Sequence, residues 1–313
     1  MYRGKVCVIG SGFVGSSIAY TLFIRGLFSE IAIIDINRDK ADGDAQDMNH
    51  GVPFVTPCEV RAADYDSCAD ADMVIITAGA NQKVGETRTD LLRRNVEVFR
   101  SIIENVTKHA KKEPIMLVVT NPVDVLTYVT YRLTGYQKHK IIGSGTVLDT
   151  ARLKSLISRH VNIDARNVHT FIVGEHGDTE FPAWSVTNIA GLTMPEYCDA
   201  CGKCNRGEIY SLAETVKSAA YDIIKKKGAT YYAIALSVAR IAEAIVNDEN
   251  SILTVSGVLY GEYNLKDVSL SVPMVVGEGG IQRIVEIPFN KEEMSALAKS
   301  AETIRASLKE VGF

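Results

Sequence analysis

The chain has 313 residues, of which 46% are hydrophobic and 23% are charged, a balance that is ordinary for a globular protein large enough for two domains. A formal net charge of −4, with only short basic runs, excludes an extended positive surface for nucleic acid. No apolar run is long enough to span a membrane, and no signal peptide opens the chain, so we expect a cytoplasmic protein without membrane or nucleic-acid partners.

The first residues place a strand, a glycine-rich turn and a helix in direct succession. A β-branched apolar run at 5–9 predicts a buried strand, and an apolar run with helical spacing follows at 13–27. The turn between them, Gly-Ser-Gly-Phe-Val-Gly at 10–15, has the dinucleotide-binding pattern GxGxxG. The helix would present its free N–H groups to the phosphates of a dinucleotide.

Each glycine of the turn has a separate task, and an acid completes the pattern. Gly10 allows the tight turn, Gly12 lets a pyrophosphate approach the backbone, and Gly15 allows the helix to pack closely on the strand. A second strand at 31–35 ends in Asp35, about 20 residues after the last glycine. A carboxylate there binds ribose hydroxyls and repels a 2′-phosphate, which favours NAD over NADP. The alternative for Asp35 is an ordinary turn residue.

Strands and helices alternate through the first half of the chain. Further strands are predicted near 58–62, 73–77, 115–119 and 140–143, and further helices near 37–49, 89–111, 123–134 and 147–160. This alternation indicates an α/β fold with a doubly wound parallel Rossmann sheet, which binds ligands beyond the carboxyl ends of its strands. The predicted cofactor-binding residues are Gly10, Gly12, Phe13, Val14, Gly15, Asp35, Thr77, Ala78, Gly79 and Asn121.

The pattern changes after about residue 160. Short β-branched runs are found at 168–173, 251–260, 267–276 and 281–287, and helical patterns at 206–227, 229–246 and 290–312. This half predicts an α+β domain with an antiparallel, twisted sheet. We expect an NAD-binding Rossmann domain at 1–145 and a substrate domain at 146–313.

A histidine flanked by glycines marks the centre of the second half. His176 lies in Val-Gly-Glu-His-Gly-Asp at 173–178, and imidazole exchanges protons near neutral pH. Asp149 and Arg152 lie upstream on a predicted helix. A histidine held by an aspartate, beside an arginine that can bind a carboxylate with two hydrogen bonds, indicates proton transfer on a small acid. The alternatives are a structural loop histidine and a surface ion pair for Arg152.

The six cysteines do not form a disulfide framework. Cys198, Cys201 and Cys204 have the spacing C-x2-C-x2-C, which could hold zinc or an iron–sulfur cluster only if a fourth ligand came from elsewhere. No second CxxC pair is present, so we expect no metal, and we interpret the segment as a solvent-exposed, oxidation-sensitive loop.

Several motifs together resemble those of one family. They occur in the order Gly-Ser-Gly-Phe-Val-Gly, Ala-Gly-Ala-Asn-Gln-Lys-Val-Gly-Glu-Thr-Arg, Asn-Pro-Val-Asp, Gly-Thr-Val-Leu-Asp-Thr-Ala-Arg and Gly-Glu-His-Gly-Asp. Over nearly its whole length the chain resembles the bacterial L-lactate dehydrogenases of the lactate/malate dehydrogenase family. The resemblance implies reversible reduction of pyruvate to lactate by NADH.

The resemblance also assigns catalytic roles. His176 would donate a proton to the substrate carbonyl, with Asp149 orienting its ring and Arg152 binding the substrate carboxylate. Arg88 would polarise the carbonyl from a mobile lid at 79–91.

Three further residues would contact the substrate. Asn121, before a proline in a cis peptide, would bind the substrate and the nicotinamide side, and Thr230 would line the pocket unless it is a helix N-cap. Gln82 stands where malate dehydrogenases carry an arginine. It leaves the second carboxylate of oxaloacetate without a partner and favours pyruvate, provided that Lys83 faces solvent.

Regulation and assembly are implied by the resemblance alone. Bacterial relatives are often activated by fructose 1,6-bisphosphate bound between subunits by an arginine and a histidine. His169 matches the histidine, but Lys154 replaces the arginine, so activation stays open. A homotetramer is expected. The remaining alternatives are a malate dehydrogenase and a non-catalytic dinucleotide-binding protein on the same fold.

Overall fold

A parallel sheet forms the centre of the computed structural model, which describes residues 4–80, 85, 87–202 and 204–313. Its parallel strands are β1 (Lys5–Ile9), β2 (Glu30–Ile34), β3 (Glu59–Ala62), β4 (Met73–Ile76), β5 (Ile115–Val118) and β6 (Ile141–Gly143). They lie in the order β3-β2-β1-β4-β5-β6. The order reverses between β1 and β4, which is where a doubly wound sheet binds its ligand.

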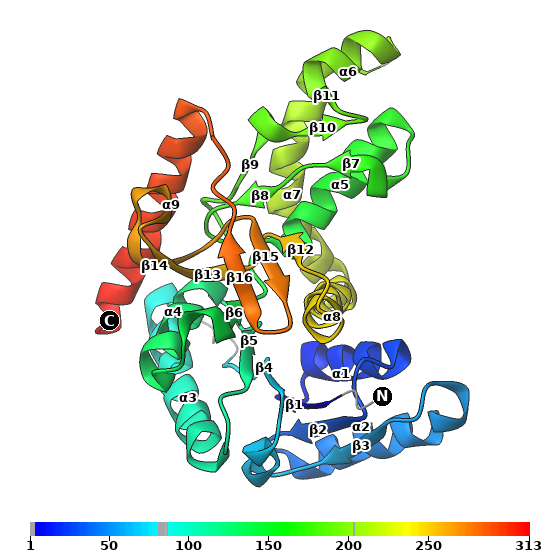
Figure 1. Cartoon of the computed structure of the whole chain (residues 1–313), viewed down its shortest axis with the longest axis vertical. Coiled ribbons are helices and arrows are strands. Elements are labelled where there is room, and N and C mark those ends of the chain that lie inside the picture. The colour runs from blue at the N-terminus through cyan, green and yellow to red at the C-terminus, as the bar shows by residue number, and fades with distance from the viewer. Residues whose placement is uncertain (1–3, 81–84, 86, 203) are drawn as a thin grey trace.

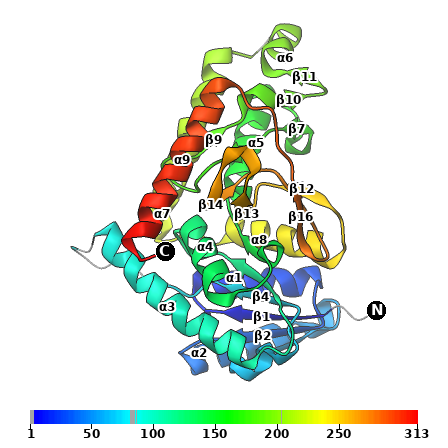
Figure 2. The same ribbon diagram turned by 60° about the vertical axis from the view of Figure 1, so that its left-hand side comes forward.

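Helices cover both faces of this sheet (Figures 1 and 2). They are α1 (Phe13–Arg25), α2 (Arg38–His50), α3 (Arg88–His109), α4 (Val123–Thr134) and α5 (Val147–Val161). Strands β4 and β5 are continuous apolar runs because both of their faces are buried, and β1 is buried along its whole length. The predicted doubly wound fold is confirmed, and its elements lie within a few residues of their predicted bounds.

The second half of the chain completes the same sheet. β13 (Ser256–Tyr260) pairs antiparallel with β6 through Ser256 and Gly143, and β14 (Lys266–Ser271) pairs antiparallel with β13. Within the part of the chain that the structure describes, the central sheet therefore has eight strands. We expected a separate antiparallel sheet in the second half of the chain. Part of it, β13 and β14, instead extends the parallel sheet of the first half.

The remaining elements form small antiparallel sheets and helices. The strands are β7 (Val168–His169), β8 (Ile172–Val173), β9 (Phe181–Pro182), β10 (Asn188–Ile189), β11 (Leu192–Thr193), β12 (Ser251–Leu253), β15 (Met274–Gly277) and β16 (Gly280–Ile284). The helices are α6 (Met194–Cys201), α7 (Arg206–Lys227), α8 (Tyr232–Val246) and α9 (Lys291–Glu310).

Three runs that we predicted as continuous strands are each divided. The run 168–173 changes sheets, since β7 pairs with β10 and β8 with β9. The run 251–260 is interrupted where the carbonyl of Thr254 accepts the N–H of Thr146, and 267–276 is interrupted at Pro273, which has no N–H to donate.

The cysteine segment is not the exposed loop that we predicted. Helix α6 ends at Cys201, and Cys198 is buried within it. Glu196 accepts the backbone N–H of Thr193 at 2.8 Å, one half of a capping box. The Thr-x-x-Glu spacing was therefore a helix signal in the sequence. Among the described residues, no helix is both long and apolar enough to cross a membrane.

Gly15 allows α1 to lie against the turn after β1. A Cβ atom there would stand 1.8 Å from the carbonyl oxygen of Gly10. Gly10 itself has φ +102°, a conformation that other residues rarely adopt. The close contact of helix and strand thus depends on glycine at both positions.

We expect Gly15→Ala to lower the free energy of unfolding by about 1–3 kcal/mol or more, because its methyl group would collide with backbone. Gly43→Ala is the matched control: Gly43 lies within α2, and a Cβ there meets nothing within 4 Å. That change should raise stability by about 0.5–1 kcal/mol. Urea denaturation of the two variants would measure both effects, and equal stabilities would contradict the packing argument.

Candidate active site

The glycine turn lies at the reversal of strand order, held by the segment that follows β4. The hydroxyl of Thr77 donates to the carbonyl of Gly10 at 3.0 Å and to that of Ile9 at 3.1 Å. The N–H of Ala78 donates to Ile9 at 2.9 Å. The predicted cofactor residues at 10–15 and 77–79 are thus brought together at the carboxyl ends of β1 and β4.

The turn fits a dinucleotide phosphate. A Cβ on Gly12 would meet nothing within 4 Å, so the space in front of it is open. No side chain caps the N-terminus of α1 and no acid lies in its first turn, which leaves its N–H groups for an anion. Asp35 accepts the N–H of Ser11 at 2.5 Å and that of Asn37 at 2.7 Å, which fixes its carboxylate beside the turn.

Phe13 and Val14 differ in burial within the same helical turn. Phe13 is exposed, whereas Val14 is half-buried against the core. The ring of Phe13 stacks on Tyr231 with centroids 5.3 Å apart, which joins the start of α1 to the loop before α8. Thr230 lies in that loop and is half-buried. It is not the N-cap of α8, a position held by Tyr231.

A buried carboxylate connects His176 to Arg152. Asp149 Oδ2 lies 2.6 Å from His176 Nδ1, and Asp149 Oδ1 accepts Arg152 Nη1 at 2.7 Å. The side chain of Asp149 is 2% exposed, against 24% for His176 and 15% for Arg152. The three side chains predicted from the sequence therefore form one cluster. It joins the first turns of α5 to the loop after β8.

Charge pairing determines the protonation of this cluster. Burial alone would lower the pKa of His176, but Asp149, and after it Glu180, raise that pKa well above its ordinary value. Burial would likewise raise the pKa of Asp149, but His176 and Arg152 lower it. The favoured state is an imidazolium paired with an ionised carboxylate, which is a proton donor ready for use.

A second buried carboxylate, to which the sequence analysis gave no role, fixes the histidine loop. Asp124 of α4 accepts the backbone N–H of His176 at 2.7 Å, and its other oxygen accepts the hydroxyls of Ser256 at 2.6 Å and Ser271 at 3.2 Å. Burial raises its pKa to about 6, although Ser256 and the His176 N–H oppose that rise. Its only sequence signal was its place in Asn-Pro-Val-Asp.

Glu180 is the second residue that the sequence analysis missed. It is buried, and its Oε2 atom lies 3.8 Å from His176 Nδ1 without a hydrogen-bond partner among the described residues. Burial raises the pKa of Glu180 to about 7, while His176 opposes the rise. Asp149, His176 and Glu180 bring three potential metal-ligating atoms within 4.8 Å of one another. Because Asp149 is already bonded to two cations, we interpret the trio as a proton-handling cluster.

The predicted lid residue Arg88 begins helix α3. Its guanidinium donates to Asp178, two residues after His176, at 2.8 Å. The side chain of Arg88 is 79% exposed, and its ion pair with Asp178 places it beside the histidine loop. The prediction for Gln82 falls on a position outside the described residues.

Asn95 of α3 ties the base of the lid segment to the predicted substrate loop. Its buried side chain accepts the N–H of Ala80 at 2.7 Å and donates to the carbonyl of Asn121 at 3.1 Å. Asn121 is exposed, and its peptide bond to Pro122 is cis, as expected. This buried asparagine had no sequence signal of its own.

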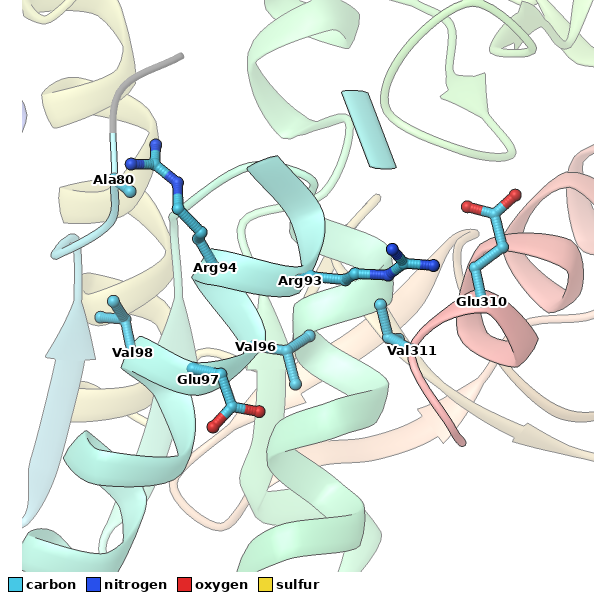
Figure 3. A pocket seen from close by; sticks show the side chains of 8 residues that line it. All are labelled: Ala80, Arg93, Arg94, Val96, Glu97, Val98, Glu310 and Val311. Carbon is cyan, nitrogen blue, oxygen red and sulfur yellow. The ribbon is translucent and has the colours of Figure 1, made fainter. Parts of the chain in front are cut away.

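A cavity lies beside this region but outside the cluster. It has a volume of about 620 Å³ between α3 and the end of α9, next to Ala80 (Figure 3). Arg93 points toward Glu310 across it. It contains none of the predicted site residues, so its size does not mark the place of the chemistry.

The two predicted allosteric residues lie on neighbouring elements. Lys154 is half-buried on α5, and burial lowers its pKa. His169 is exposed on β7, a strand that packs against α5.

Comparisons with known proteins agree with this geometry. Residues 4–143 match the NAD-binding domain of lactate/malate dehydrogenase, and residues 146–312 match its α/β C-terminal domain. The chain belongs to the lactate/malate dehydrogenase family.

Relatives at high identity span nearly the whole chain. An L-lactate dehydrogenase of Acetivibrio thermocellus is 60% identical, covering 97% of this chain and 96% of the relative. L-lactate dehydrogenase 1 of Clostridium acetobutylicum is 54% identical, covering 97% of each. A solved lactate dehydrogenase from a deep-sea metagenome library has a TM-score of 0.97 at 42% identity, covering 100% of both chains. The predictions of family, fold class and an NAD-dependent lactate dehydrogenase are confirmed.

Glu180→Gln should lower the pKa of His176, because it removes one of the two carboxylates that favour the imidazolium. Burial raises the pKa of Glu180 to about 7, so the pKa of His176 should change chiefly above pH 7, where the Glu180 carboxylate is charged in the parent chain. NMR titration of the His176 imidazole measures the change. Glu175→Gln is the matched control, since Glu175 accepts the hydroxyl of Thr179 instead. An unchanged His176 pKa in Glu180→Gln would refute the electrostatic role of Glu180.

Proposed function

We propose that the chain reduces pyruvate reversibly to L-lactate with NADH and that His176 is the proton donor. The observation that carries this proposal is the single buried carboxylate of Asp149 bonded to both His176 and Arg152. One group thereby holds a proton donor beside a guanidinium that can bind an acid. Reduction of a 2-keto acid requires this pair.

The protein residues divide the reaction between them. With Nδ1 of His176 occupied by Asp149, Nε2 is the nitrogen left to protonate the carbonyl oxygen. The charge on Asp149 stabilises the imidazolium before transfer and orients the ring throughout. Arg152 bonds Asp149 through one nitrogen and has further donors for the substrate carboxylate. Arg88 would move from Asp178 onto the carbonyl when the lid closes.

Residues of the first half would hold the cofactor. NAD supplies the hydride acceptor or donor when it is bound. The open space at Gly12 and the uncapped start of α1 suit its pyrophosphate. Asp35 suits a ribose hydroxyl and repels the extra phosphate of NADP. Asn121 and Thr230 would line the substrate side, at the cis-proline loop and at the loop before α8.

Substrate preference follows from Gln82. A neutral amide cannot pair with the second carboxylate of oxaloacetate in a closed site, so pyruvate is the proposed substrate. Four expectations stay predictions. They are the domain boundary between residues 145 and 146, a homotetramer, a cytoplasmic location, and activation by fructose 1,6-bisphosphate through Lys154 and His169.

His176→Ala should reduce kcat for pyruvate by about 100- to 10,000-fold, the usual contribution of a general acid. The Kd for NADH should be unchanged, because the dinucleotide turn is a separate structure. Steady-state kinetics and NADH fluorescence titration measure the two quantities. His50→Ala, at the exposed end of α2, is the control and should retain full activity. Near-normal turnover in His176→Ala would remove the residue from the mechanism.

Gln82→Arg should shift the ratio of kcat/KM for pyruvate over oxaloacetate toward oxaloacetate by on the order of a hundredfold. The new guanidinium would pair with the carboxylate that the parent leaves unpaired. Lys83→Gln is the control and should leave the ratio in place. A wild-type preference for oxaloacetate that Lys83→Gln abolishes would instead assign the discrimination to Lys83.

A further inference from the structure

The cysteines at the end of α6 are not used by the proposed chemistry, and two of them lie in contact. Cys201 is the last residue of α6, and Gly202 caps the helix with φ 61°. This left-handed glycine turns the chain back on itself. Cys204 therefore returns to Cys201, with the two Sγ atoms 3.1 Å apart. A disulfide bond requires about 2.05 Å, so oxidation needs only a small approach.

The pair is placed where a small reagent can reach it. Cys201 and Cys204 are both half-buried. They lie at the junction of α6 and α7, at the end of the molecule remote from β1 and β4 (Figures 1 and 2). Asn205 caps α7 by accepting the N–H of Gly207 at 2.9 Å, so α7 begins directly after the pair.

The thiol of Cys204 resists ionisation. Burial, and then the neighbouring thiols of Cys198 and Cys201, raise the pKa of Cys204. Thiolates attack disulfides and thiols do not, so Cys204 is a poor first nucleophile. Cys198 is buried among the apolar side chains that pack on α5 and is the competing partner for Cys204.

The other cysteines provide an internal control. Cys7 and Cys68 are also neighbouring thiols, but both are fully buried beside the parallel sheet, and Cys58 is buried as well. A reagent in solution therefore distinguishes the pair at the α6–α7 junction from the three cysteines of the first half.

We propose that Cys201 and Cys204 form a reversible thiol–disulfide site that a low-molecular-weight disulfide oxidises. The Cys201 thiolate attacks one sulfur of the reagent, forming a mixed disulfide and releasing one thiol. The Cys204 thiolate then attacks Cys201 Sγ and releases the second thiol. In total, two cysteine thiols and one reagent disulfide become one protein disulfide and two reagent thiols. The cysteines are oxidised and the reagent is reduced.

The test is intact-mass spectrometry of the full chain after incubation with oxidised glutathione, followed by peptide mapping. The expected product has lost two hydrogens, carries no glutathione and contains a Cys201–Cys204 linkage that dithiothreitol reverses. Formation should accelerate with rising pH, because Cys204 must ionise. Cys7, Cys58 and Cys68 should remain reduced. A retained glutathione, a Cys198–Cys204 linkage or an unmodified chain would each overturn the proposal.

Two variants separate the steps. Cys204→Ser should trap one glutathione on Cys201, whereas Cys198→Ser should form the disulfide as the parent does. If Cys198→Ser formed no disulfide, the reactive residue would be Cys198 and the proposal would be wrong. None of these measurements involves His176 or lactate dehydrogenase activity, so failure here and failure of the proposed function are distinguishable.

Discussion

The site depends on a negative charge that the fold holds out of water. Asp149 is almost completely buried, and isolated burial of a carboxylate is too costly to persist. His176 and Arg152 supply the compensating charges, and each is thereby fixed in place. Removing one partner from such a buried ion pair typically lowers the free energy of unfolding by about 3–5 kcal/mol. Stability and catalysis therefore place the same demand on this cluster, and an exposed aspartate would satisfy neither.

A second buried acid explains why the two halves of the chain cannot be treated as independent. Asp124 belongs to α4, yet its oxygens are satisfied by Ser256, Ser271 and the backbone of His176, all from the second half. β13 brings Ser256 to this position by pairing with β6. The extension of the parallel sheet is thus also what orients the histidine loop, and a boundary drawn in the chain at residue 146 crosses one hydrogen-bonded unit.

The correct predictions from the sequence are those that depend on local pattern. Apolar runs of strand length and the glycine turn located β1, α1 and the dinucleotide site, because burial on both faces and φ +102° at Gly10 leave few residue types permitted. The sequence could not reveal pairings between segments far apart in the chain. Ser256 reaches Asp124 across 132 positions, and no periodicity records such a contact. Glu180 was missed because only burial makes it different from an ordinary loop glutamate.

The two acids beside His176, Asp149 and Glu180, differ in their protonation. Asp149 is bonded to two cations and keeps its charge, whereas Glu180 has an unpartnered oxygen, and burial raises its pKa to about 7. Two carboxylates beside one imidazole thus differ in protonation because Asp149 is bonded directly to His176 and Arg152, whereas Glu180 lies 3.8 Å from the ring nitrogen. Near neutral pH, Asp149 maintains the imidazolium and Glu180 gains or loses a proton next to it. The imidazole consequently meets a fixed charge on one side and a pH-dependent charge on the other. This asymmetry comes from the position of Asp149 between the imidazole of His176 and the guanidinium of Arg152.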